Sequence, residues 1–155
     1  MQAGPDTLLH YSPLLFLVFF VAVWILASLL ISFVGGWHAL SARFAQQSEP
    51  YGDTRTAGPF FYGVYTRFWT HYSGIIRMTT TKDALYLSVL FLFSAGHPPL
   101  CIPWNEIQIG RTKCLWCRYV VLTLGRQERI PMRISERMAR NLGILERLAE
   151  AAPPA

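Results

Sequence analysis

Charged residues and cysteines are both scarce in this 155-residue chain. Asp, Glu, Lys and Arg together make up 15% of the residues, whereas about 25% is usual for a soluble domain. Three cysteines are too few for a disulfide-stapled secreted scaffold. Hydrophobic residues reach 52%, which excludes intrinsic disorder as a description of the whole chain. The length fits one compact domain, and the sequence contains no internal repeat or extended low-complexity tract.

The apolar excess is concentrated near the N-terminus. Residues 14–34 contain no charged side chain, and their only serines are Ser28 and Ser32. As a helix this segment would extend about 31 Å, which is close to the thickness of the hydrocarbon core of a bilayer. A glycine pair ends the run, and Trp37 follows at the level where amphipathic rings sit in a membrane interface. The pattern predicts one transmembrane helix over residues 14–34, with Trp37 as its interface anchor.

A buried helix of a soluble protein and a cleaved signal peptide are the two alternatives to a membrane anchor. Buried helices are usually shorter than this run and carry some polar residues. A signal peptide needs a basic segment before an apolar stretch of about 7–15 residues. Residues 1–13 carry only one charge, that of Asp6, and the apolar run is longer than a signal peptide requires. A retained single-pass anchor is therefore the favoured prediction.

Lysine and arginine fall on one side of this helix only. None precedes it, whereas Arg43 and Arg55 follow it closely. Because positive charge is retained on the cytoplasmic side, we expect residues 1–13 to form a short extracytoplasmic tail. The part of the chain that follows the helix is then expected to be cytoplasmic.

The next segment, residues 35–58, is predicted to be an interfacial helix and a linker. Trp37, Leu40 and Phe44 are spaced i, i+3 and i+7, which is the spacing of an amphipathic helix lying along the membrane surface. Residues 46–58 are polar and rich in turn formers, which is typical of a linker. We therefore expect the folded domain to occupy residues 59–150, followed by a tail at 151–155.

From residue 59 the hydrophobic pattern changes to the alternation expected of β-strands. The segment 59–72 is rich in aromatic residues, which is typical of strands or of an interface. Further strands are predicted at residues 74–80, 84–93, 100–104, 106–110, 119–124 and 129–134. The second half of the strand at 84–93 is expected to be buried on both faces, because apolar residues fill both of its alternating sets.

One amphipathic helix is predicted after the last strand. Ser135 is the expected N-cap, and Met138, Leu142, Leu145 and Ala149 form an apolar stripe that reaches to about residue 150. Short antiparallel strands followed by one helix indicate an α+β fold. The predicted architecture is one transmembrane helix and then a small antiparallel β-barrel or sandwich with a C-terminal amphipathic helix.

A short motif within the strands gives a resemblance. Residues 83–107 contain a strand, then His97-Pro98-Pro99-Leu100, then Ile102-Pro103-Trp104 and the pair Glu106-Ile107. This segment resembles an uncharacterised family of small bacterial single-pass membrane proteins with a cytoplasmic pleckstrin-homology-like domain, and the rest of the β domain resembles it loosely. The resemblance implies that fold and a bacterial inner membrane. It implies no catalytic residue, because pleckstrin-like domains bind lipids, peptides or one another.

Basic residues gather in residues 111–133, and Glu128 is the only acidic residue in this stretch. We expect Lys113 and Arg118 to project from one loop. Arg126 and Arg129 would project from the next loop, so that a patch forms at one end of the β domain. Arginine binds phosphate in a bidentate manner, and a basic patch beside a membrane attracts anionic lipid. The candidate contact residues are Arg111, Lys113, Arg118, Arg126, Arg129 and Arg133.

Anionic phospholipid headgroups or a membrane protein are the expected partners of this patch, in addition to the bilayer itself. The alternative is a generally basic cytoplasmic face with no specific ligand. Nucleic acid is not an expected partner, because no recognition motif accompanies the charge.

Cysteine and histidine provide the competing, chemical interpretation. Cys114 and Cys117 form a CxxC pair, but a zinc site needs four ligands, and Cys101, His71 and His97 lack the usual ligand spacing. A thioredoxin-type pair would begin a helix, whereas this pair lies beside a predicted strand. His97 precedes Cys101 by four residues, as a base might precede a nucleophile, but no orienting carboxylate accompanies them.

Two hypotheses follow from the sequence. The favoured one is a non-enzymatic, membrane-anchored protein with no cofactor, whose cytoplasmic β domain contacts anionic lipid or a membrane protein. The alternative is a small membrane-bound enzyme or a redox or metal factor that uses His97, Cys101 or the Cys114/Cys117 pair.

Overall fold

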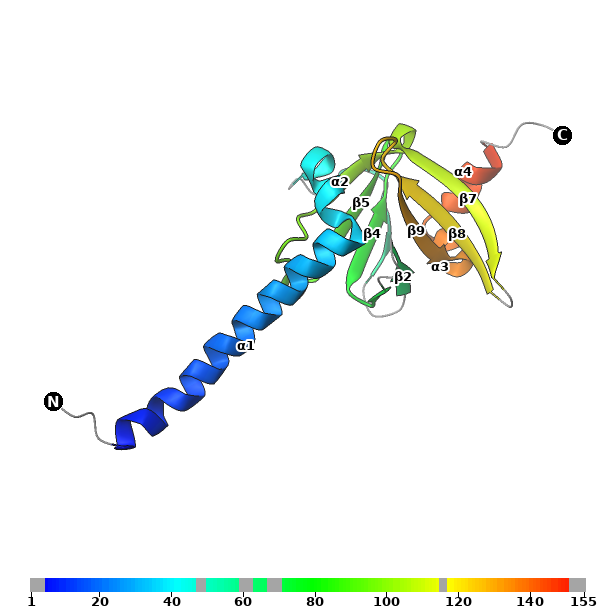
Figure 1. The fold of residues 1–155 in the computed structure, drawn as a ribbon. Coiled ribbons are helices and arrows are strands. Elements are labelled where there is room, and N and C mark those ends of the chain that lie inside the picture. Colours follow the sequence, from blue (N-terminus) through cyan, green and yellow to red (C-terminus); the bar gives the residue numbers. More distant parts are fainter. Residues whose placement is uncertain (1–4, 47–49, 59–62, 67–70, 115–116, 151–155) are drawn as a thin grey trace.

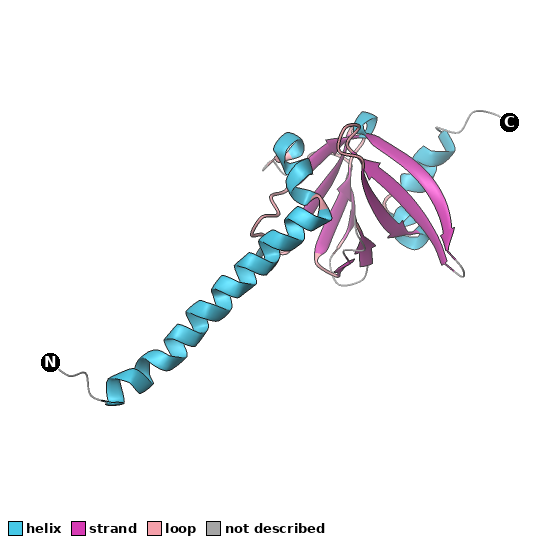
Figure 2. Ribbon diagram, viewed as in Figure 1, coloured by secondary structure: helices cyan, strands magenta, loops and turns pink. Residues whose placement is uncertain are grey.

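In the computed structural model a long N-terminal helix projects from a two-sheet β domain (Figure 1). The structure describes residues 5–46, 50–58, 63–66, 71–114 and 117–150. Short helices lie on the flanks of the β domain (Figure 2). The fold is therefore α+β, as the sequence predicts.

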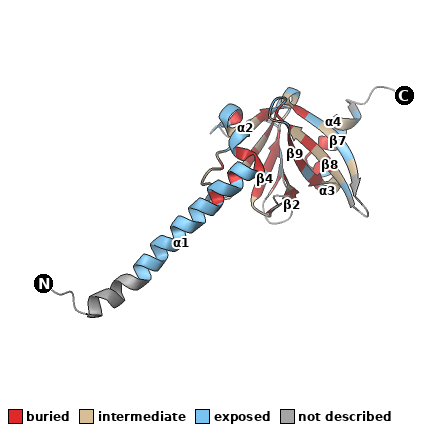
Figure 3. Cartoon of the chain, in the orientation of Figure 1, coloured by how far each residue is buried: buried red, intermediate tan, exposed pale blue. Residues whose placement is uncertain are grey.

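The N-terminal helix α1 (Pro5–Gly35) contains the predicted membrane segment. Its part Pro13–Gly35 is long and apolar enough to cross a membrane, and 6% of the apolar window is buried by the protein. Figure 3 shows exposed residues along most of α1 beside the buried residues of the β domain. α1 begins at Pro5, nine residues before the predicted start of the membrane helix, and Pro13 lies inside it.

The chain turns sharply after α1 and forms a second helix, α2 (Trp37–Phe44). Gly36 makes the turn in the left-handed region, with φ 82°, and a Cβ at Gly36 would lie 2.7 Å from Cδ1 of Ile130. The predicted amphipathic helix is confirmed, but Trp37, Leu40 and Phe44 are buried against the β domain. They do not lie along a membrane surface, because the turn at Gly36 directs this face of α2 into the core.

The strands form two antiparallel sheets. The first has the order β1-β4-β5-β6, and these strands are β1 (Arg55–Ala57), β4 (Ile76–Thr80), β5 (Ala84–Val89) and β6 (Leu100–Pro103). The second has the order β3-β2-β9-β8-β7, and these strands are β2 (Gly63–Tyr65), β3 (His71–Ser73), β7 (Ile107–Cys114), β8 (Cys117–Leu124) and β9 (Ile130–Ser135). The arrangement is an open sandwich rather than a closed barrel. Within it, β1 lies inside the stretch predicted as a linker.

The core lies between the two sheets. Met78, Leu85 and Ile102 of the first sheet are fully buried, as are Leu122 and Ile134 of the second. Burial of apolar side chains on one alternating set of each strand is the main stabilising contribution to such a sandwich, at about 25 cal/mol per Å².

The predicted strand at residues 84–93 is shorter than expected. β5 ends at Val89, and Phe91–Phe93 form a single 3₁₀ turn, η2. Phe91 and Leu92 are 79% and 54% exposed, so the prediction of burial on both faces is wrong. The physical reason is that the chain leaves the sheet here and runs beside the last turns of α1 (Figure 1).

The predicted C-terminal helix is two helices, α3 (Glu136–Asn141) and α4 (Ile144–Glu150). Its N-cap is confirmed, because Oγ of Ser135 accepts a hydrogen bond from the Met138 N–H at 3.2 Å. Gly143 separates the helices in the left-handed region, with φ 71°. α3 packs against β1, β8 and β9, and α4 follows along the edge of the sandwich.

Candidate functional site

Three hydrogen-bond donors lie on one face of α1. Trp24, Ser28 and Ser32 are spaced i, i+4 and i+8, which places them in line along the helix. We call them the donor stripe. The carbonyls that accept from the stripe are Leu92 O (3.0 Å from Trp24 Nε1), Phe93 O (3.3 Å) and Ala95 O (2.9 Å) from Ser28 Oγ, and Gly96 O from Ser32 Oγ. All belong to the connection between β5 and β6, which we call the 90–97 loop.

The 90–97 loop touches α1 closely. Gly96 has φ 76°, and a Cβ there would lie 2.8 Å from Cδ2 of Leu29. The ring centroids of Phe93 and Trp24 are 5.0 Å apart. Ser28 and Ser32 are buried by this contact, whereas the apolar residues between and around them stay exposed. The β domain is thus attached to α1 along its side as well as through the chain.

His97 ends the loop inside the protein. Its side chain is 3% exposed, with Nε2 3.2 Å from Oη of Tyr72 and Nδ1 3.1 Å from the Ala95 carbonyl. Burial lowers the pKa of His97, although contacts with the backbone at Ala95 and Phe93 oppose this shift. Burial also raises the pKa of Tyr72 to about 12. Burial at this junction therefore favours the neutral imidazole of His97 and the neutral phenol of Tyr72.

Trp37 belongs to the same junction. Its ring is 2% exposed and lies 5.3 Å from the His97 ring, and its Nε1 donates to the Pro98 carbonyl at 2.9 Å. The predicted interface anchor is therefore packed by the protein itself rather than turned toward lipid headgroups. The physical reason is again the turn at Gly36, which carries Trp37 into the domain.

The six predicted contact residues do not form one patch. Lys113 and Arg118 are register partners near the β7–β8 turn, and Arg126 and Arg129 lie in the β8–β9 turn. Successive turns of an antiparallel meander lie at opposite ends of the strand that joins them. β8 has eight residues, so the two turns are about 26 Å apart along it. Arg133 lies on β9, between these ends.

The described residues at the β7–β8 end face a small hollow. Arg111 and Arg118 line it together with Glu136 of α3, and its volume is about 220 Å³. The side chain of Lys113 lies outside the part of the chain that the structure describes.

The β8–β9 end is a cluster of mixed charge. Arg126 Nε donates to the Asn105 carbonyl at 2.8 Å. Arg43 of α2 forms ion pairs with Glu128 at 3.2 Å and with Glu106 at 3.6 Å. Two carboxylates therefore accompany the basic residues here, and the cluster ties α2 to this turn.

The cysteines and His97 are not brought together in the described residues. Cys114 and Cys117 pair across the end of the β7–β8 hairpin, but residues 115–116 and the side chains of both cysteines lie outside the described part. Cys101 is a free thiol on β6, opposite Tyr86, whereas His97 contacts Tyr72 and Ala95. Among the residues the structure describes, no three His, Cys, Asp or Glu side chains cluster as a metal site would require.

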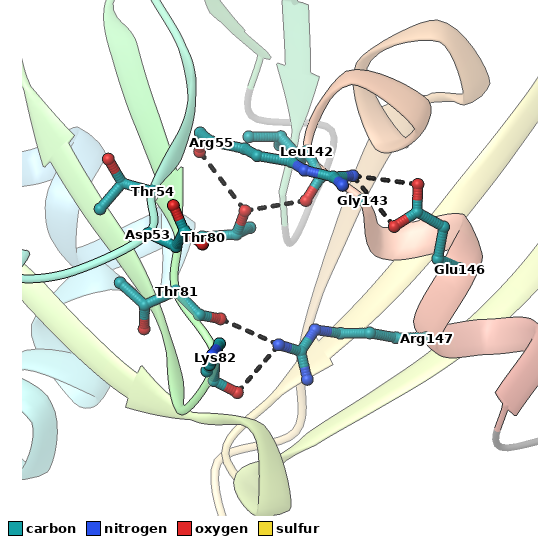
Figure 4. Close-up of a pocket in the computed structure, with 10 residues that line it drawn as sticks. All are labelled: Asp53, Thr54, Arg55, Thr80, Thr81, Lys82, Leu142, Gly143, Glu146 and Arg147. Atoms are coloured by element: carbon teal, nitrogen blue, oxygen red, sulfur yellow. Dashed lines mark hydrogen bonds and ion pairs between the residues drawn. The ribbon is translucent and has the colours of Figure 1, made fainter.

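A polar cleft lies between the edge of the first sheet and α4 (Figure 4). Its volume is about 580 Å³. Arg55 and Glu146 form an ion pair across it at 3.0 Å, and Oγ1 of Thr80 donates to the Leu142 carbonyl at 2.8 Å. Arg147 Nη2 donates to the carbonyls of Thr81 and Lys82, at 3.0 and 2.8 Å.

The residues that line this cleft are mainly polar or charged. Its lining residues include no histidine or cysteine. Their charged groups are used in part to hold α4 on the β4–β5 turn. The sequence pattern assigns Arg55 only to the positive charge that follows the membrane helix, and no local signal places Arg55 and Arg147 on opposite walls of one cleft.

Arg77 is a basic residue that the predicted patch omitted. It is exposed on β4 and lines a hollow of about 200 Å³ with Val89 and Phe91. It therefore places a cation directly beside the exposed apolar part of the 90–97 loop. The donor stripe on α1 was missed as well, although its spacing was a readable signal in an otherwise apolar helix.

Comparison of the chain with protein-family models, with curated proteins and with solved structures gave no match, so the site is interpreted from its own geometry.

Proposed function

We propose that this chain is a non-enzymatic, single-pass membrane protein whose β domain contacts anionic lipid headgroups. In this proposal α1 crosses a bacterial inner membrane, with the N-terminus outside and the β domain in the cytoplasm. The observation that carries the proposal is the attachment of the β domain to the side of an exposed, apolar helix through the donor stripe. A domain attached in this way stays beside the membrane surface rather than hanging on a flexible tether.

Arg77 is the residue best placed for a headgroup. It lies beside Phe91, and the 90–97 loop contacts the last turns of α1. Its long side chain would therefore extend toward the phosphates of the leaflet in which α1 ends. Arginine binds a phosphate through two parallel hydrogen bonds, and each basic residue near an anionic leaflet contributes about 1 kcal/mol.

We also propose that the β domain is pleckstrin-homology-like. The support is the order of its elements, with two antiparallel sheets followed by a helix that packs on them. The residues at the β7–β8 end, including Arg111 and Arg118, then form a second basic surface that suits a membrane protein partner.

Lipids that remain bound to the full-length chain test the headgroup contact. The protein is extracted from bacterial membranes in a mild detergent, and its bound lipids are identified by mass spectrometry. We expect phosphatidylglycerol and cardiolipin to be enriched over their share of the bulk membrane. The variant Arg77→Gln should lose most of this enrichment, and Arg140→Gln, which changes an exposed arginine on α3, should keep it.

Bound lipid of bulk composition in the unmodified protein would contradict the proposal. If a second protein co-purified with the chain in stoichiometric amount and the bound lipid had the bulk composition, the alternative of a membrane protein partner would be favoured instead.

A further inference from the structure

The 90–97 loop presents apolar side chains away from the protein. Phe91 is 79% exposed and Leu92 is 54% exposed. Both follow β5 directly in the single turn η2, where a connection between two strands is ordinarily polar. An aromatic and an aliphatic side chain exposed together in a short loop indicate an apolar environment around it.

The position of this loop along α1 defines that environment. Leu92 O accepts from Trp24, which precedes the end of α1 at Gly35 by eleven residues. This corresponds to about 16 Å along the helix axis, about half of a hydrocarbon core of about 30 Å. At the same level α1 itself exposes apolar side chains, such as Phe20 and Val23, at 53% and 47%. The exposed surfaces of the loop and of the helix are therefore continuous.

The backbone carbonyls of residues 90–96 all have the hydrogen-bond donors that entry into a bilayer requires. A carbonyl without a hydrogen-bond donor costs several kcal/mol in hydrocarbon, so irregular backbone enters a membrane only where the protein satisfies it. The donor stripe supplies donors to the carbonyls at four of the five positions 92–96, namely Leu92, Phe93, Ala95 and Gly96. The Ser94 N–H and the His97 N–H are bonded within the loop, to Phe91 O at 3.1 Å and to Ser94 O at 2.8 Å.

We propose that the tip of the 90–97 loop inserts into the acyl-chain region of the membrane beside α1, with Phe91 and Leu92 among the lipid tails. This inference rests on the proposed function, because it requires α1 to cross the membrane. It adds a second point of membrane contact, one that fixes the rotation of the β domain about α1. Arg77, which lines a hollow with Phe91, then lies beside the inserted tip, and its long side chain would have to extend toward the lipid phosphates.

Spin-label accessibility in proteoliposomes tests the insertion. The full chain, with Cys101, Cys114 and Cys117 replaced by serine, receives one new cysteine at a time and a nitroxide label. Leu92→Cys and Phe91→Cys probe the loop. Leu17→Cys, 56% exposed on α1, is the lipid reference, and Gln108→Cys, exposed on β7, is the aqueous reference. The vesicles contain phosphatidylcholine and phosphatidylglycerol, and circular dichroism and the thermal midpoint check that each variant is folded like its parent.

The labels at residues 91 and 92 are expected to behave like the label at residue 17. Oxygen should reach them and a water-soluble nickel complex should not, which gives an oxygen-to-nickel ratio several-fold above that at residue 108. A loop label that the nickel complex reaches as freely as residue 108, with residue 17 still in lipid, would overturn the insertion and leave the proposed function intact.

Two further outcomes distinguish the remaining possibilities. A loop label that neither reagent reaches would overturn the insertion in favour of a protein contact, such as a second copy of this chain. Nickel access at residue 17 would overturn the membrane span itself, and the insertion with it.

Discussion

Single residues at the junction of α1 and the β domain determine how closely the two parts approach. Gly96 permits the 90–97 loop to lie against Leu29, and Gly36 permits the turn that buries Trp37. His97 then fills the space between them, with its ring nitrogens beside Tyr72 and the Ala95 carbonyl. Each of these residues has a distinct physical requirement, so each yields its own prediction.

Replacement of Gly96 by alanine tests the close approach. A Cβ at Gly96 would lie 2.8 Å from Cδ2 of Leu29 and 3.4 Å from its Cα, so the helix and loop would have to move apart. We expect Gly96→Ala to lower the free energy of unfolding by about 2–3 kcal/mol in thermal melts of the detergent-solubilised protein. Gly52→Ala is the matched control, because Gly52 also has positive φ (94°) but nothing lies within 4 Å of its Cβ position. The control should cost about 1 kcal/mol, and equal losses in the two variants would contradict the contact.

The burial of His97 predicts a pH dependence of stability. Because its pKa in the folded protein is below the ordinary value of about 6.5, the unfolded chain binds more protons than the folded chain in acid. Its contribution to stability is therefore complete above about pH 6.5 and is lost as the pH falls from there toward the folded-state pKa. The thermal midpoint should drop between about pH 8 and about pH 5. His97→Gln should melt lower throughout but with a weaker pH dependence, and an unchanged dependence would exclude His97 as its source.

At the scale of elements, the 90–97 loop and α4 are each held by a few polar contacts to their neighbours. The loop depends on the donor stripe of α1. α4 depends on Arg147, whose guanidinium donates to two carbonyls of the β4–β5 turn and lies 4.4 Å from the Trp104 ring centroid. Removal of a donor in either place takes hydrogen bonds from these carbonyls, although Ala95 O keeps its contact with His97 Nδ1 and Thr81 O keeps the bond from Trp104 Nε1.

Ser28→Ala tests the attachment of the loop. It removes the Ser28 hydroxyl from Phe93 O and from Ala95 O, of which Ala95 O keeps its contact with His97, and a buried carbonyl left without a donor costs about 1–3 kcal/mol. We expect amide hydrogen exchange at Ser94 and His97 to quicken by about tenfold or more, since about 1.4 kcal/mol corresponds to a factor of ten. Leu30→Ala, on an exposed position of the same helix, serves as the control. Exchange that is as slow in Ser28→Ala as in this control would show that the loop does not depend on the stripe.

Arg147→Ala tests the attachment of α4. Loss of two hydrogen bonds and of the contact with Trp104 should lower the free energy of unfolding by about 1–3 kcal/mol. Arg140→Ala, on the exposed side of α3, should change it by no more than about 0.5 kcal/mol. Chemical denaturation in detergent measures both, and similar small effects would mean that Arg147 is only a solvated surface residue.

The elements also show which parts of the fold could be predicted. The helix over residues 14–34 and the alternating strands were predictable, because each depends on a local pattern that tertiary contacts do not change. The Phe91–Phe93 turn was not, because apolar residues on both alternating sets fit a buried strand and a lipid-facing loop equally well. The last helix was predicted as one continuous element, and the left-handed φ of Gly143 is what divides it.

The basic patch failed for a topological reason rather than a local one. Arg118 and Arg126 are close in sequence, but a whole strand of the meander separates the two turns. Arg77, which lies far away in sequence, is the cation that the fold places beside the exposed loop. The distribution of charge along the sequence therefore pointed to arginine as the contact residue, but it did not show which arginines the fold places beside the exposed loop.

At the scale of the whole molecule, helix and domain form one body. The sequence alone predicts an interfacial helix and a polar linker between the membrane helix and the β domain. In the structure, α2 lies in the core, β1 occupies part of the expected linker, and the 90–97 loop lies along α1. The proposed headgroup contact and the proposed insertion both require this fixed arrangement, because a swivelling domain would present no constant face to lipid.

The distance between α1 and the β domain in a bilayer tests this central claim most directly. Nitroxides at Leu17→Cys and Gln108→Cys, in the cysteine-free full chain in proteoliposomes, give that distance by pulsed electron spin resonance. A fixed attachment predicts one narrow distance distribution, and Ser28→Ala should broaden it. A broad distance distribution in the parent protein, unaltered by Ser28→Ala, would contradict the account. It would mean that the β domain is joined to α1 only by a flexible linker.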